Sequence, residues 1–328
     1  MEKVEFCDFA PSGWCENPEE SKFLLRLYSI IPCPTSKIKE MFSGKTRMPT
    51  SDKIPVWLGG CEMEANKLLR AEWKQPYSNP ETGQIVWPNH LSHIDLPLSS
   101  YLYLATPHEI DGIASSEVET ENRLNRVEAL LALYFGRNSV FKVVFSALID
   151  AQKGGQYSVI GEVIANIQPC DGPEMLPENW EYFEETCQRI EVIGDSDTKD
   201  RIQRALELFH SGKTCPDTAL TEKFVFYWTS IQVLCEGGGT METNKRLQRI
   251  YGFTKNEVEE RLLWRGVIRS RNDFYHRGKR ISLHKDAERY MQFLFLDLLR
   301  DEIGLEPVGA SLASIAALDL KIFRNDNA

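Results

Sequence analysis

The sequence has little that would place the chain outside a cell or across a membrane. Its longer apolar runs, such as Val140–Ile149, fall short of the roughly 20 residues that a spanning helix needs. The opening residues Met1–Glu5 are largely charged and lack the apolar core of a secretory signal. We therefore expect a cytoplasmic protein that makes no contact with a membrane.

Cysteine is sparse and is never closely paired. The 328 residues hold eight cysteines, and no two have the two- or four-residue spacing that structural zinc modules use. Secreted disulfide scaffolds are far denser in cysteine. We expect mostly reduced, apolar thiols and neither a structural metal nor a cofactor. The segment His90–Asp95, which contains His93, resembles a metal-ligand cluster. The third and fourth ligands that a metal site would need are not evident.

The chain is acidic, and positive charge is in deficit. There are 48 acidic and 38 basic residues, giving a formal net charge of −10. Such a chain repels polyanions at long range, so the sequence argues against a protein that coats nucleic acid broadly. A nucleic-acid site would need a local reversal of sign.

Within an expected N-terminal domain of residues 1–172, residues 1 to about 112 are rich in turn-forming residues that separate short apolar runs. Short runs bounded by glycine, proline and asparagine are typical of strands. Residues 116–137 form an exception, because their apolar residues recur at helical spacing. We expect a β-rich or mixed N-terminal domain with a sensing or regulatory role, followed by a linker at Pro169–Pro177. The predicted strands are Phe23–Ile31, Ile54–Leu58, Gln84–Trp87, Ser100–Ala105 and Tyr157–Ile167.

Residues 173–328 have helical patterns almost throughout. Thr254 and Glu257 fit a capping box that opens a helix expected to continue to His276, with Gly278 as its stop. Short connections favour a compact antiparallel bundle. The fold class expected for the whole chain is therefore α+β. The other predicted helices are Asn179–Glu191, Lys199–His210 (closed by Gly212), Asp217–Glu236, Glu242–Tyr251 and Asp286–Ile303.

The local reversal of sign lies between residues 261 and 280. This stretch holds seven basic residues against one acid, Asp273, and His276 lies among them. RNA can be cut when its 2′-hydroxyl attacks the neighbouring phosphate, which needs proton transfer and positive charge on the developing phosphorane. Histidine suits the first task, and arginine suits the second. The seven basic residues are Arg261, Arg265, Arg269, Arg271, Arg277, Lys279 and Arg280.

The run from Arg271 to His276 resembles the R-(N/D/H)-x3-H signature of HEPN domains. The flanking segments Thr221–Leu234 and Lys285–Leu299 are similar to helices of the ApeA-like HEPN branch, and the resemblance covers about residues 195–305. It implies a helical bundle that forms a homodimer, with the two motifs meeting at the interface. Many members are metal-independent ribonucleases in toxin, CRISPR or phage-defence systems, and others only bind or dimerise. By this resemblance Arg271 would hold phosphate, His276 would be the acid/base, and Asn272 would orient one of them.

Helical phase leaves the choice of arginine open. Arg269, Asn272 and His276 share one stripe of an ideal helix. A buried, unpaired guanidinium would be costly, so Arg271 must reach phosphate or a partner, or else Arg269 serves the site. The stripe that Arg271 follows is otherwise apolar and consists of Trp264, Val267, Ile268 and Tyr275.

Two further interpretations of this segment remain. Basic residues and histidine near a helix C-terminus also stabilise the helix through its dipole and free carbonyls. The same bundle would serve a non-catalytic protein that dimerises or binds RNA or a nucleotide. If the segment is active, we expect the remaining basic residues to contact RNA phosphates: Arg265, Arg269, Arg277, Lys279 and Arg280.

Overall fold

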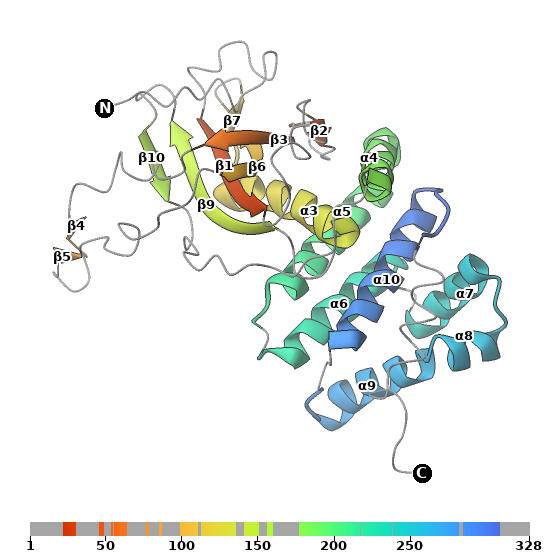
Figure 1. The fold of residues 1–328 in the computed structure, drawn as a ribbon. Coiled ribbons are helices and arrows are strands. Elements are labelled where there is room, and N and C mark those ends of the chain that lie inside the picture. Colours follow the sequence, from red (N-terminus) through yellow and green to blue (C-terminus); the bar gives the residue numbers. More distant parts are fainter. Residues whose placement is uncertain are drawn as a thin grey trace. The chain divides into compact units, whose positions relative to one another are not determined.

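The fold combines an antiparallel sheet with a group of helices and is therefore α+β, as predicted (Figure 1). It divides into two compact units, Met1–Leu124 with Asn138–Glu181 and Asn125–Arg137 with Tyr182–Ala328. The computed structural model describes residues 22–30, 46–48, 54, 56–63, 77–78, 85–86, 99–110, 113–135, 141–150, 156–159, 177–216, 218–237, 239–281 and 285–308.

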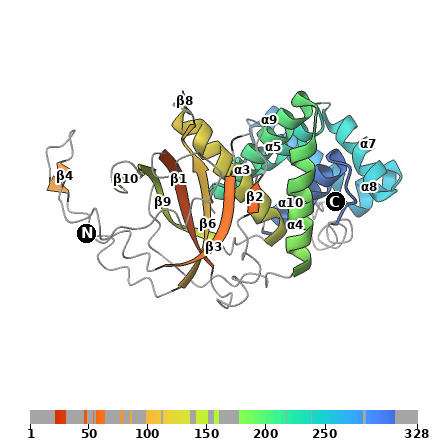
Figure 2. The same cartoon turned by 90° about the horizontal axis from the view of Figure 1, so that it is seen from above.

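The first unit is built on a six-stranded sheet with the order β10-β9-β1-β6-β3-β2. All its strand pairs are antiparallel, and β9, β1, β6 and β3 lie side by side in Figure 2. Consecutive residues Phe23–Arg26 of β1 are all buried, so this strand is covered on both faces. The strands are β1 (Lys22–Ile30), β2 (Thr46–Met48), β3 (Val56–Met63), β6 (Ser99–Pro107), β9 (Phe141–Asp150) and β10 (Gln156–Val159).

Strands occur at all the predicted segments, with shifted ends. Two small hairpins join β4 (Tyr77–Ser78) to β5 (Ile85–Val86) and β7 (Glu109–Ile110) to β8 (Ile113–Ala114). Residues 160–167 of the last predicted strand and residues 169–176 of the predicted linker lie outside the described residues.

Helix α3 (Glu117–Phe135) confirms the amphipathic pattern over residues 116–137. Leu124, Val127 and Leu130 are buried along one side, as the helical spacing predicts. Near the start of the helix, the buried Arg123 donates hydrogen bonds to the Pro107 carbonyl and the Ser115 hydroxyl. The helix is therefore anchored to the segment that leads into it.

The second unit is helical, and α6 packs against both α5 and α10 (Figure 1). Phe209 of α5 lies in its core, with its ring 5.2 Å from Tyr227 and 4.8 Å from Phe295. The helices are α4 (Pro177–Val192), α5 (Ser196–Thr214), α6 (Leu220–Leu234), α7 (Gly239–Tyr251), α8 (Lys255–Arg261), α9 (Trp264–Arg277) and α10 (Lys285–Glu302).

Gly212 does not end its helix, contrary to the prediction. Helix α5 continues to Thr214, and Gly212 is buried inside its last turns. A Cβ at this position would lie 3.1 Å from both the Phe226 Cβ and the Tyr227 ring. The glycine is therefore explained by the close approach of α5 and α6 rather than by a helix stop.

The single helix predicted from Thr254 to His276 is also wrong, because the chain turns at Leu263. The capping box of Thr254 and Glu257 is present, but α8 ends at Arg261 and α9 begins at Trp264. Leu263 has a φ of 50°, in the left-handed region. Leu262 and Trp264 are both fully buried. Side chains that are two residues apart on one helix point in nearly opposite directions. Burial of both Leu262 and Trp264 in the same core therefore requires a break between them.

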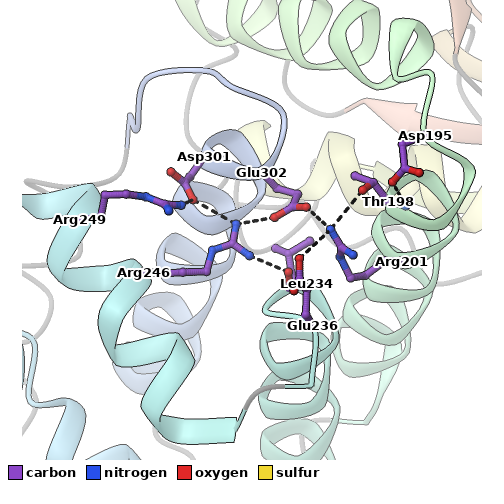
Figure 3. Close-up of polar contacts among 9 residues, drawn as sticks. All are labelled: Asp195, Thr198, Arg201, Leu234, Glu236, Arg246, Arg249, Asp301 and Glu302. Carbon is purple, nitrogen blue, oxygen red and sulfur yellow. Dashed lines mark hydrogen bonds and ion pairs between the residues drawn. The ribbon is translucent and has the colours of Figure 1, made fainter.

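An ionic network joins α5, α7 and the C-terminal ends of α6 and α10 (Figure 3). Arg246 donates to the Leu234 carbonyl at 2.8 Å, to Asp301 at 3.0 Å and to Glu302 at 2.5 Å. Arg201 binds the other oxygen of Glu302. These contacts tie α7, and the chain that leads through α8 to α9, to the rest of the unit.

None of the described helices is long and apolar enough to cross a bilayer.

Candidate functional site

Helix α9 carries the predicted site at its exposed C-terminal half. Its start is fixed by Trp264, which is fully buried and stacks on Trp228 of α6 with ring centroids 5.6 Å apart. Gly278 ends the helix, as predicted, with a φ of 63°. Beyond it, the Ile281 amide donates to the Thr221 hydroxyl, which donates in turn to the Ile281 carbonyl. Both ends of the site segment are thus attached to α6.

The motif residues Arg271, Asn272 and His276 come together. The Nη1 of Arg271 lies 2.9 Å from Asn272 Oδ1 and 3.3 Å from His276 Nε2. A guanidinium has no acceptor, so it can donate to the imidazole only when Nε2 carries a lone pair. The contact therefore links the guanidinium to the imidazole ring of the motif.

Arg271 reaches His276 although its Cα follows the apolar stripe of α9. That stripe is buried at Trp264 and Val267 but emerges into solvent at Tyr275, which is 47% exposed. The Arg271 guanidinium carbon lies 4.9 Å from the centroid of the Tyr275 ring. The side chain is therefore half-buried at the edge of the core, although its Nε is buried with no hydrogen-bond partner among the described residues.

The other basic residues differ in their neighbours. Four of the seven form ion pairs with acids of α8 and α9. In the described part of the chain, Arg269 and Arg280 form no ion pair or hydrogen bond. The four pairs are Arg261–Glu257, Arg265–Glu259, Arg277–Asp273 and Lys279–Asp273.

These ion pairs reduce the positive charge that the sequence suggests. Two of the acids, Glu257 and Glu259, lie on α8 just before the basic stretch and were therefore not part of its charge balance. Exposed ion pairs of this kind contribute about 1 kcal/mol or less, so a phosphate can displace the carboxylates. Within the described ranges, Arg269 and Arg271 form no ion pair with an acid, and these are the two arginines between which helical phase left the choice open.

Two contacts of this segment were not predicted from the sequence. Tyr275 was assigned to the apolar stripe, yet its i,i+4 spacing from Arg271 indicates a contact on one helix face. The pairing of Thr221 with Ile281 spans 60 residues and has no sequence signal.

Among the remaining candidates, those that the structure describes do not form a second site. His90, His93 and Asp95 lie outside the described residues. Within the described ranges, no three or more histidine, cysteine, aspartate or glutamate side chains are arranged to hold a metal ion. His210 faces Glu128 at 3.3 Å, inside the helical unit, and the thiols of Cys187 and Cys235 are buried there.

Comparison with known proteins does not assign the chain to a family. No family model, no curated protein and no solved structure matches it.

Proposed function

We propose that the protein is a metal-independent endoribonuclease of the HEPN type, acting on RNA as a homodimer through its C-terminal helical unit. The family resemblance extends this to an effector role in phage defence or as a toxin. Its N-terminal unit then senses a trigger or restrains the site.

The observation that supports this best is the contact between Arg271 and His276. An imidazole that can accept a proton lies 3.3 Å from a guanidinium that lacks a carboxylate partner in the described residues. The paired N–H donors of an arginine side chain match the spacing of phosphate oxygens, and such charge-assisted hydrogen bonds stabilise a phosphorane. Asn272 holds the same Nη1 and thereby limits where the guanidinium can point.

The reaction needs one group to take a proton and another to give one. His276 removes the proton from the ribose 2′-hydroxyl, the 2′ oxygen bonds to phosphorus, and the bond from phosphorus to the 5′ oxygen breaks. The leaving 5′ oxygen must then receive a proton. In the described residues of one chain, His276 is the one imidazole next to the motif arginine. The proposal assigns the second proton transfer to His276 of a second copy.

Cleavage of labelled RNA by the full-length protein in excess chelator tests the proposal. We expect cleavage by the wild type, loss in His276→Ala, and loss in Arg271→Ala but not in Arg269→Ala. Arg249→Ala, which removes an exposed arginine of α7 outside the basic stretch, is the matched control and should retain most of the activity. Cleavage that persists in His276→Ala would exclude this site.

The alternative is a non-catalytic protein that dimerises or binds RNA or a nucleotide through the same unit. The exposed Tyr275 favours it, because an aromatic side chain at the open end of an apolar stripe is suited to contact another molecule. The absence of cleavage, together with dimerisation that depends on concentration and is weakened by Tyr275→Asp, would support this alternative over the ribonuclease.

A further inference from the structure

The Arg271 side chain has few polar partners in the described residues. Nη1 donates to Asn272 and His276, Nε is buried with no hydrogen bond in the described residues, and no acid pairs with the side chain there. A long side chain with several rotatable bonds loses much conformational entropy when it is held in one place. The two hydrogen bonds on Nη1 hold one end of the guanidinium, while Nη2 has no hydrogen-bond partner in the described residues and keeps more freedom.

The contact that removes this freedom is the ring of Tyr275. The guanidinium carbon lies 4.9 Å from its centroid, within the range of an attractive cation–π contact. Tyr275 is itself held by Phe274, whose ring meets it edge to face at 5.0 Å and 76°. Side chains at i and i+4 share a helix face, so the pair is built into α9 rather than brought together by a distant segment.

We propose that Tyr275 is a positioning residue, whose aromatic ring holds Arg271 in reach of His276 and of the scissile phosphate. This inference rests on the proposed function and adds a residue that the Arg-to-His signature leaves unspecified. The ring acts through Arg271, so its phenol hydroxyl is not needed. Phenylalanine at this position must therefore suffice, and alanine must not.

The chain contains a matched control. Arg289 and Phe293 of α10 have the same i,i+4 spacing, with the guanidinium carbon 5.4 Å from the ring centroid. Phe293→Ala removes an equivalent arginine–aromatic contact in another helix. An effect that Tyr275→Ala shows and Phe293→Ala lacks therefore belongs to the site.

The first measurement is NMR of the Arg271 side chain in the full-length, arginine-labelled protein, assigned by its loss in Arg271→Gln. A guanidinium stacked on a ring experiences the ring current, so the Arg271 side-chain protons should resonate upfield. We expect this shift to persist in Tyr275→Phe and Phe293→Ala and to vanish in Tyr275→Ala. If Tyr275→Ala leaves the shift unchanged, the proposal is overturned, whether or not the protein cleaves RNA.

The second measurement is the rate of RNA cleavage. Tyr275→Ala should lower kcat by roughly tenfold or more with little change in KM, because a misplaced catalytic group slows the reaction while substrate still binds. Tyr275→Phe should restore the rate. A higher KM at unchanged kcat would overturn the proposal and make Tyr275 a surface for bases. If the wild type does not cleave RNA, the proposed function fails, while the NMR result still decides whether Tyr275 holds Arg271.

Discussion

Removal of Arg246 should destabilise the helical unit far more than removal of its neighbour Arg249. Both arginines bind Asp301 Oδ2, at 3.0 and 2.6 Å (Figure 3). The side chain of Arg246 is 8% exposed and that of Arg249 is 67% exposed. The two arginines therefore differ in burial and in their partners, because Arg246 also binds Glu302 and the Leu234 carbonyl.

The magnitude follows from what each substitution leaves behind. Arg246→Ala strands the Leu234 carbonyl and removes one of the two arginines that bind Glu302, whose other partner is Arg201. Loss of one partner from a buried pair costs about 3–5 kcal/mol. Because Asp301 and Glu302 each retain a second arginine, we expect about 3 kcal/mol. The exposed Arg249 should contribute less than about 1 kcal/mol.

Urea unfolding of the full-length chain, followed by circular dichroism, measures both free energies. The Arg249→Ala midpoint should lie close to that of the wild type, and the small difference should shrink further in high salt. A loss of stability in Arg246→Ala no greater than in Arg249→Ala would refute the reasoning that a buried arginine with three acceptors stabilises the unit more than an exposed arginine with one.

Three more substitutions test other parts of the structure. Trp264→Ala should lower the free energy of unfolding in urea by about 3–5 kcal/mol, because it leaves a cavity at a fully buried site against Trp228. A decrease no larger than that caused by alanine at an exposed position would contradict this prediction. Glu236→Gly should raise Tm, since Glu236 has a φ of 60° that glycine adopts without strain; a lower Tm would show that its ion pair to Arg201 matters more. The Thr254 backbone amide, and then its hydroxyl, lower the pKa of Glu257. Wild type should thus exceed Glu257→Gln in stability near neutral pH and lose this advantage as pH falls through that lowered pKa; a difference independent of pH would exclude the charge as its cause.

Local patterns in the sequence predicted most of the elements of the fold. Apolar spacing located α3, a capping box located the start of α8, and Gly278 located the end of α9, since each signal lies within a few residues of its effect. The break at Leu263 was not predictable in this way. It depends on both Leu262 and Trp264 packing into the same core, which is a tertiary requirement that overrides local helical pattern.

The candidate site was predicted in composition but not in geometry. The motif named Arg271, Asn272 and His276, while ideal helical phase favoured Arg269 as the neighbour of the imidazole. Phase locates Cα atoms, whereas a long arginine side chain can reach across the helix surface, and Arg271 does so. The acids that pair with Arg261 and Arg265 lie just before the basic stretch: Glu257 is one turn before Arg261 on α8, and Glu259 of α8 pairs with Arg265 of α9 across the break at Leu263.

The chemical identity of the RNA ends produced in excess chelator tests the central claim most directly. A ribonuclease that works through the ribose 2′-hydroxyl leaves a 2′,3′-cyclic phosphate on one fragment and a 5′-hydroxyl on the other, which mass spectrometry distinguishes. We predict these ends for the wild type and no cleavage by His276→Ala. Products with a 3′-hydroxyl and a 5′-phosphate, or unchanged cleavage by His276→Ala, would contradict the account.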